Sequence, residues 1–184
     1  MEIAGQGAGA LGLACIAMPA HLEPLCYLDY GHADGSLQIV TCDDRKLLVS
    51  VPSPHDRTSM AAVSEDGAHL VTGGKNGVLA AWRFDITEMR LRLVRHMTGH
   101  RAAITAINVS HRNDILVSAS VDGTALVWQL GTGRLLWETN MGGGTGSQNS
   151  GKAVLGVKIT AVTGDVLVVR EVYFSSPLTC IIHT

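Results

Sequence analysis

Short runs of alternating apolar and polar residues cover most of the chain from Leu25 onward, and residues that favour turns separate them. Between positions 104 and 130 the runs ITAINVS, ILVSAS and TALVWQL are joined by the turns HRND and VDG. Such tight turns can join only antiparallel neighbours, so these runs predict short antiparallel strands. The pattern therefore predicts an all-β chain made of successive meanders.

The meander repeats along the chain at a nearly constant spacing. Four pairs of like residues lie 46 positions apart, and Gly35 precedes Gly77 by 42: the pairs are Trp82 and Trp128, Gly77 and Gly123, Ser64 and Ser110, and Leu70 and Leu116. Self-similarity with a period of about 40–50 residues is typical of propellers and other repeat arrays. We therefore expect radially arranged four-stranded sheets, called blades here, about three intact and one partial.

The period assigns an approximate range to each unit. We expect blades at 25–52, 55–97, 99–140 and 153–184, with a Gly-rich insertion, MGGGTGSQNSG, at 141–151. The fourth unit lacks an Asp-Gly turn and a Trp, so we expect it to be degenerate or cut short. Residues 1–24 are rich in Ala and Gly and are expected to form a lead-in that holds at most an incomplete strand.

Composition narrows the class of protein. Hydrophobic residues make up 46% of the chain and charged residues 16%, which is typical of a folded domain rather than a disordered tail. The net charge is −2 and Lys and Arg form no cluster, so we expect no nucleic-acid partner.

The four cysteines show no Cys-x-x-Cys spacing and are expected to be reduced thiols rather than metal ligands. The N-terminal segment carries Glu2 where a signal peptide has a basic residue, and it is too weakly apolar to span a bilayer.

Two Gly-rich segments resemble nucleotide-binding loops. The stretch 146–152 matches GxxxxGK, but Ala153 stands where a magnesium-binding hydroxyl is needed, and the following AVLGVKIT predicts a strand instead of a helix. Gly7, Gly9 and Gly12 fit GxGxxG, but too little chain precedes them to form the required strand. We therefore expect no cofactor and no enzymatic activity, with a nucleotide-binding enzyme using 146–152 as a distant alternative.

His96 and His100 are four residues apart, a spacing that binds metal when both lie on a helix. Gly99 places His100 in a loop instead, so a structural role is expected for it. No residue set predicts a metal site or a catalytic nucleophile.

The unit introduced by Gly99-His100 and closed by Trp128 resembles a WD40 repeat, and the resemblance covers about 25–175. In WD40 proteins a four-residue hydrogen-bond network braces each blade. The resemblance implies that His100 before the first strand meets Ser118 on the second, Asp122 in the following turn and Trp128 on the third.

The second unit departs from this pattern. Asn76 stands in place of the turn Asp, and SPHDR replaces the Gly-His step, so that His55 is one position out of register. Thr72 and Trp82 remain as members of the bracing network. We therefore expect the second blade to be less well braced.

GHADGSLQI at 31–39 resembles the element that opens the C-terminal propeller of BEACH-domain proteins, the neurobeachin and lysosomal-trafficking-regulator group, with Ala33 in place of Trp. LVTGGKNGVLAAW and VKITAVTGDVLVV are also similar to repeats of that group. The resemblance implies a non-catalytic interaction scaffold in vesicle or membrane trafficking. It implies a cytoplasmic location, peripheral to endomembranes, with contact to membranes only indirect or through the rest of a longer chain.

In WD40 proteins the loops before the first strand and between the second and third strands share one face, which binds other proteins. The residues expected on this interaction face are His32, Asp34, His55, Arg57, Lys75, Asn76 and Arg101. A WD40 adaptor in ubiquitin ligation or signalling remains an alternative function. An array of about four blades is short of a seven-bladed ring, so self-association through open blade edges is also expected.

Overall fold

The computed structural model describes the chain over a set of ranges. These are residues 12–15, 26–30, 36–41, 43–44, 46–55, 57–140, 154–160, 163–170 and 178–182. All regular structure in them is β-strand, arranged in four antiparallel sheets. None of the described ranges contains a helix with the length and apolarity needed to cross a bilayer. The all-β prediction is confirmed.

The sheets follow one another in chain order, and within each sheet every strand pairs with its neighbour in sequence. The first sheet contains β1 Gly12–Cys15, β2 Cys26–Tyr30, β3 Ser36–Thr41 and β4 Leu47–Pro52. The second contains β5 Thr58–Val63, β6 His69–Gly74, β7 Leu79–Asp85 and β8 Arg90–Met97. The third contains β9 Ile104–Ser110, β10 Ile115–Ser120, β11 Thr124–Gln129 and β12 Leu135–Asn140. The last contains β13 Val154–Ile159, β14 Val166–Arg170 and β15 Leu178–Ile182.

The first sheet begins earlier than the sequence pattern predicts. Strand β1 lies within 1–24, the range expected to be a lead-in, and pairs with β2 in register Gly12↔Tyr30. Its sequence, GLAC, carries no charged or long polar residue. A strand this short and uniformly small and apolar has no alternation to reveal it.

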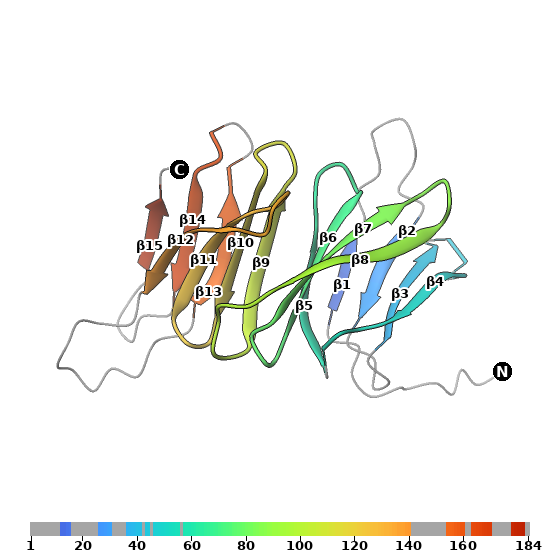
Figure 1. Cartoon of the computed structure of the whole chain (residues 1–184), viewed down its shortest axis with the longest axis horizontal. Coiled ribbons are helices and arrows are strands. Elements are labelled where there is room, and N and C mark those ends of the chain that lie inside the picture. Colours follow the sequence, from blue (N-terminus) through green and yellow to red (C-terminus); the bar gives the residue numbers. More distant parts are fainter. Residues whose placement is uncertain are drawn as a thin grey trace.

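The sheets stand side by side as blades, from the N-terminal sheet at one end of the molecule to the C-terminal sheet at the other (Figure 1). The first strands β1, β5, β9 and β13 contact each other from one sheet to the next. This is the arrangement of a propeller, in which the first strand of every blade lines the central axis. The array is partial and does not close into a ring.

Three apolar clusters fill the spaces between successive blades. Leu37 packs with Leu70 and Trp82 between the first and second blades, and Val71 packs with Leu116 between the second and third. A third cluster joins the third blade to the β13–β15 sheet. Every residue of β10 is buried because this strand is covered on both faces. Blade stacking therefore supplies the hydrophobic core that no single sheet could form.

One irregularity recurs in three blades. The pairing of the third and fourth strands shifts register between Ile39 and Val40, between Ala81 and Trp82, and between Val127 and Trp128. These positions are separated by 42 and then 46 residues, the spacings of the sequence repeat. A β-bulge increases the local twist, so the same twist of the outer edge is built into each of these blades.

Candidate interaction face and the networks that brace it

A directed chain of hydrogen bonds runs through the third blade around His100. The indole Nε1–H of Trp128 donates to Oγ of Ser118 at 2.9 Å, and Oγ of Ser118 lies 2.7 Å from Nε2 of His100. On the other side of the ring, Nδ1 lies 2.7 Å from Oγ1 of Thr124, whose hydroxyl donates to Oδ1 of Asp122 at 2.5 Å.

The carboxylate at the end of this chain fixes the direction of the bonds on its side of the ring. A carboxylate only accepts, so the Thr124 hydroxyl donates to it, and the Thr124 oxygen accepts the Nδ1–H of His100. Burial lowers the pKa of His100 and so favours the neutral ring. In a neutral ring with its proton on Nδ1, Nε2 accepts the Ser118 hydroxyl, and each polar group of the network has a partner.

The network differs from the expected one in how Asp122 takes part. Its Oδ1 lies 3.9 Å from Nδ1 of His100, too far for a hydrogen bond, and Thr124 bridges the two. Asp122 also accepts the backbone N–H of Arg101 at 2.7 Å and that of Thr124 at 2.9 Å. Asp122 thus ties the segment before β9 to the turn between β10 and β11.

Burial and charge act on the titration of this pair. Burial lowers the pKa of His100 below its ordinary value, although the nearby Asp122 carboxylate opposes this. Partial burial raises the pKa of Asp122, but the hydrogen bonds from Thr124 and Arg101 outweigh it and hold that pKa below its usual range. A neutral ring beside a charged carboxylate follows from both shifts.

The second blade contains the same arrangement, with one link missing. Trp82 Nε1–H donates to Oγ1 of Thr72 at 3.0 Å, and this oxygen lies 3.1 Å from Nε2 of His55. The interaction-face prediction for His55 is wrong, because only 3% of this residue is exposed and its ring points into the blade. The one-residue shift in SPHDR is absorbed by the connector, so His55 takes the position that His100 has in the third blade.

The missing link is the hydroxyl that Thr124 supplies in the third blade. Asn76 Oδ1 accepts the backbone N–H of Val78 at 3.2 Å, as Asp122 accepts that of Thr124. Val78 occupies the position 46 residues before Thr124 but has no hydroxyl. The buried Nδ1 of His55 consequently has no hydrogen-bond partner, and burial lowers the pKa of this ring. A buried polar atom without a hydrogen-bond partner is costly.

Four of the predicted face residues are exposed at one end of the blades: Arg57, Lys75, Asn76 and Arg101. The backbone N–H of Lys75 donates to the carbonyl of Arg57 at 3.2 Å, which places these two side by side. Gly77, with φ +80°, packs so tightly that an added Cβ would lie 2.7 Å from the carbonyl oxygen of His100. The loops of the second and third blades therefore meet at this face. His32 and Asp34 lie outside the described residues.

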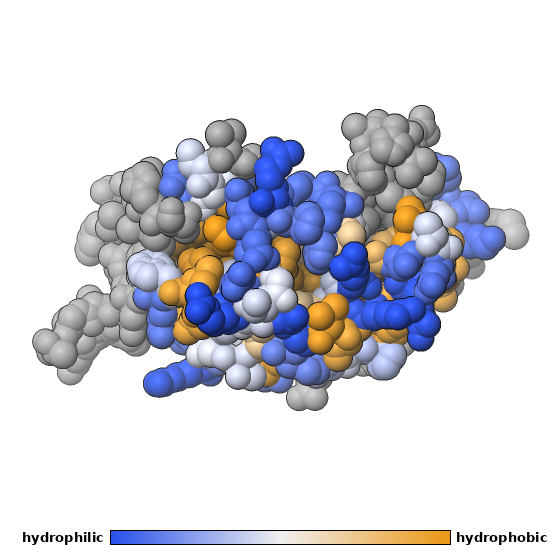
Figure 2. Space-filling view, turned by 45° about the horizontal axis from the view of Figure 1, so that its top comes forward, coloured by the Kyte–Doolittle hydropathy of each residue, from blue (hydrophilic) through white to orange (hydrophobic). Residues whose placement is uncertain are grey.

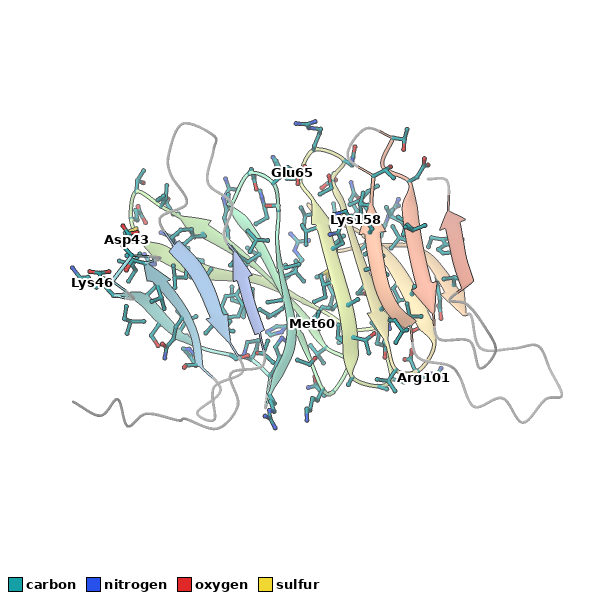
Figure 3. The ribbon with its side chains drawn as sticks, turned by 180° about the vertical axis from the view of Figure 1, so that it is seen from behind. Asp43, Lys46, Met60, Glu65, Arg101 and Lys158 are labelled. Carbon is teal, nitrogen blue, oxygen red and sulfur yellow. The ribbon has the colours of Figure 1, made fainter. Side chains whose placement is uncertain are left out.

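A hollow of about 380 Å³ opens on the same face beside Arg101. It is lined by Gly99, Arg101, Asp122, Thr124 and Glu138. The carboxylate of Asp122 is engaged by the network, whereas the side chains of Arg57, Lys75 and Arg101 project from the blade ends. The face therefore presents three cationic side chains on loops that the bracing networks hold in place (Arg101 is labelled in Figure 3).

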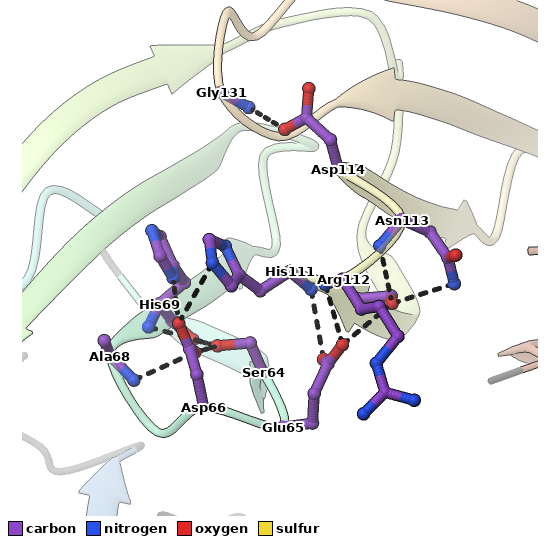
Figure 4. Close-up of polar contacts among 11 residues, drawn as sticks. Ser64, Glu65, Asp66, Ala68, His69, His111, Arg112, Asn113, Asp114 and Gly131 are labelled. Atoms are coloured by element: carbon purple, nitrogen blue, oxygen red, sulfur yellow. Dashed lines mark hydrogen bonds and ion pairs between the residues drawn. The ribbon is translucent and has the colours of Figure 1, made fainter.

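The opposite end of the blades carries a cluster of polar contacts that the sequence did not reveal (Figure 4). Glu65 in the β5–β6 turn accepts from the backbone N–H of Arg112 at 2.8 Å, from that of His111 at 3.0 Å, and from Oγ of Ser110 at 3.1 Å. Glu65 and Lys158 lie at the end remote from Arg101 (Figure 3). Burial raises the pKa of Glu65, but these hydrogen bonds outweigh it and hold the pKa below its usual range.

The period does contain a signal for this contact. Glu65 and His111 are 46 residues apart and so occupy equivalent turns of adjacent blades. Equivalent turns of a propeller are neighbours in space, so an acidic residue in one can cap the backbone of the next. His69 and His111 are 42 residues apart, so their proximity does not show as a short spacing in the chain.

The segment after the Gly-rich loop bears on the nucleotide-binding alternative. Residues 146–152 lie outside the described residues, but strand β13 begins at Val154 and pairs with β14. A phosphate-binding loop of this type requires a helix at that point, whose N-terminal N–H groups bind the phosphates. The described segment 154–159 is a strand and not such a helix.

Comparison with known families and proteins identifies the repeat. The family "WD domain, G-beta repeat" matches residues 91–129, which run from the last strand of the second blade to the Trp-bearing third strand of the next. The solved structure of U3-55K superposes with a TM-score of 0.64 at 17% sequence identity, over 85% of this chain and 48% of that one. The WD40-type fold is therefore confirmed, and the chain spans about half of that chain's length.

Three curated relatives show a second similarity. The chain is 33% identical to Protein SPIRRIG of Arabidopsis thaliana over 110 residues and 30% identical to BEACH domain-containing protein A2 of the same species over 125. It is 29% identical to the human Lysosomal-trafficking regulator over 109 residues. These matches cover 56%, 65% and 56% of this chain but only 3%, 4% and 3% of the relatives. The resemblance to BEACH-domain proteins is thus confirmed over the WD region.

Proposed function

We propose that this chain is a non-catalytic protein-interaction scaffold that acts in vesicle or membrane trafficking as the WD40 part of a BEACH-type protein. The face with Arg57, Lys75, Asn76 and Arg101 is its recognition surface. Its partners are other proteins, and it acts in the cytoplasm at the periphery of endomembranes. The similarity to the Lysosomal-trafficking regulator and BEACH domain-containing protein A2 supports a role in vesicle or membrane trafficking.

The observation that carries this proposal is the position of exposed cations on braced loops. Asp122 holds the backbone of Arg101, and the Arg57 carbonyl accepts from Lys75. Side chains on loops fixed by a rigid scaffold lose little conformational freedom on binding, which favours recognition. The three exposed cations favour an acidic segment of a partner protein, although Asp122 and Glu138 also line the hollow beside Arg101.

The unclosed array adds a second means of association. In the described part of the chain the β13–β15 sheet covers the third blade with Val154, Ile159 and Val168, and Leu155 on its other side is 56% exposed. A blade face of this kind is covered by the next blade in a closed ring. We infer that another segment of a longer chain, or a second copy, covers it.

Apolar side chains are also exposed on the outer strands β8 and β12, among polar ones (Figure 2). They are Leu93 and Val94 on β8 and Leu135, Leu136 and Trp137 on β12. Exposed apolar groups of this size favour association with other proteins.

Proximity labelling in cells tests the proposal. The chain is compared with a face variant, Arg57→Glu/Lys75→Glu/Arg101→Glu, and with a control in which three exposed cations elsewhere are reversed, Arg90→Glu/Arg112→Glu/Lys158→Glu. We expect endosomal and lysosomal trafficking proteins near the unmodified chain and the control, and their loss with the face variant.

Two results would count against parts of the proposal. Equal labelling by the face variant and the control would exclude the cationic face as the recognition surface. A neighbour set dominated by ubiquitin-ligase or signalling components would favour the adaptor alternative over trafficking.

A further inference from the structure

Three side chains that can bind a metal ion converge between the second and third blades. Asp66 lies in the β5–β6 turn, His69 is the first residue of β6, and His111 lies in the β9–β10 turn. One oxygen and two ring nitrogens of these residues lie within 4.8 Å of one another. The cluster joins two blades beside Glu65 (Figure 4), and Glu65 lies at the end remote from Arg101 (Figure 3).

Both rings point at the same carboxylate oxygen. Nδ1 of His69 lies 3.0 Å from Oδ2 of Asp66, and Nε2 of His111 lies 3.7 Å from that oxygen. The two rings are stacked, with centroids 4.5 Å apart and planes 14° apart, so their nitrogens lie along one side of the stack. In tetrahedral zinc sites with bonds of about 2.0–2.1 Å, ligand atoms are ~3.3 Å apart. Binding requires the exposed His111 ring to tilt out of the stack, so that its Nε2 lone pair meets the same ion as Nδ1 of His69.

The neighbouring contacts hold these ligands in place. Glu65 fixes the His111 turn through its backbone N–H, and Oδ1 of Asp66 accepts the Ala68 N–H at 3.1 Å and the Ser64 hydroxyl, which leaves Oδ2 for the cluster. The Asp66, His69 and His111 side chains are 29%, 21% and 53% exposed, so an ion can enter from solvent. Two imidazoles and a carboxylate are ligands that suit zinc and its neighbours in the first transition row.

We propose that Asp66, His69 and His111 form a three-ligand site for a first-row divalent transition metal such as Zn²⁺, with water completing the coordination. The ion takes the place between His69 Nδ1 and Asp66 that a shared proton occupies in its absence, and the neutral ring then carries its proton on Nε2. Because Asp66 and His69 belong to the second blade and His111 to the third, the bound metal crosslinks the two blades and stabilises this end of the array.

Titration of the chelator-treated full chain with Zn²⁺, in competition with a chromogenic chelator, tests the site. We expect one equivalent to bind with micromolar affinity and to raise the melting temperature by several degrees. His69→Asn and His111→Asn should each weaken this equivalent at least tenfold. His96→Asn, a change of an exposed histidine on β8, should leave it unchanged. The His111→Asn variant keeps the backbone bond to Glu65, and circular dichroism checks its fold.

Replacement of Zn²⁺ by Co²⁺ distinguishes this site from the four cysteines. Nitrogen and oxygen ligands give weak visible bands, whereas thiolates add intense charge-transfer bands in the near ultraviolet. Weak bands that disappear with His111→Asn support the site. Thiolate bands, or a titration that is the same in the unmodified chain and in both histidine variants, would overturn the proposal.

Discussion

Thr124→Val is the sharpest test of the bracing network in the third blade. The change keeps the size and branching of the side chain, and both residues favour strands, so only the hydroxyl is lost. That hydroxyl accepts from His100 Nδ1 at 2.7 Å and donates to Asp122 Oδ1 at 2.5 Å. Its loss leaves Nδ1 of His100 buried without a partner, as Nδ1 of His55 is in the second blade.

The expected cost follows from these two bonds. An orphaned buried donor costs about 1–3 kcal/mol. Loss of the hydrogen bond to Asp122 costs less. Asp122 keeps two backbone donors, and its side chain is 16% exposed, so water can replace the hydroxyl. We expect a total of about 2 kcal/mol, which corresponds to a fall in melting temperature of about 4–8 °C for a chain of this length.

The assay is urea unfolding followed by tryptophan fluorescence, since Trp128 is part of the network. The reciprocal variant Val78→Thr places a hydroxyl at the equivalent position of the second blade and should stabilise the chain by about 1 kcal/mol, because His55 Nδ1 then has a hydrogen-bond partner. If Thr124→Val unfolds within about 0.3 kcal/mol of the unmodified chain, the inferred direction of the hydrogen bonds is incorrect.

Three further predictions concern the same end of the blades. Asp122→Ala removes three hydrogen bonds and should destabilise the chain by a few kcal/mol, whereas Asn76→Ala removes one and should cost clearly less in the same urea assay; equal costs would contradict the assignment. Burial lowers the pKa of His55 and His100, so the unfolded chain binds more protons below pH about 6.5, and the urea midpoint should fall as the pH drops from 7.5 to 5.5; a constant midpoint would contradict this. Gly77→Ala should lower the melting temperature, because φ is +80° and the new methyl group meets the His100 carbonyl; an unchanged value would show that the loops separate freely.

The sequence repeat predicted the blades because one blade is one period. The 46-residue spacing that relates Trp82 to Trp128 also relates their register shifts and their hydrogen bonds to Thr72 and Ser118. His55 was misassigned because it lies one position away from the place where a strict period puts the network histidine, so that period leaves the second blade without that histidine. In the structure the irregular connector before β5 takes up that shift, and the ring still reaches Thr72.

The detailed side-chain contacts, within a blade and between blades, were harder to predict. The Thr124 bridge was missed because WD40 resemblance pairs His100 with Asp122 directly, whereas the actual distance of 3.9 Å leaves room for a hydroxyl. The Asp66, His69 and His111 cluster depends on the angle between blades as well as on their sequence. Periodicity indicates which turns are neighbours, but side-chain geometry decides whether ring nitrogens converge.

The blades form an unclosed array with an apolar face available for association. Light scattering over a range of concentrations, combined with binding of a fluorescent apolar dye, tests it most directly on the isolated chain. We expect self-association that increases with concentration, and dye fluorescence that falls as the oligomer forms. A monodisperse monomer that binds no dye would contradict it and would indicate that the blades close on themselves.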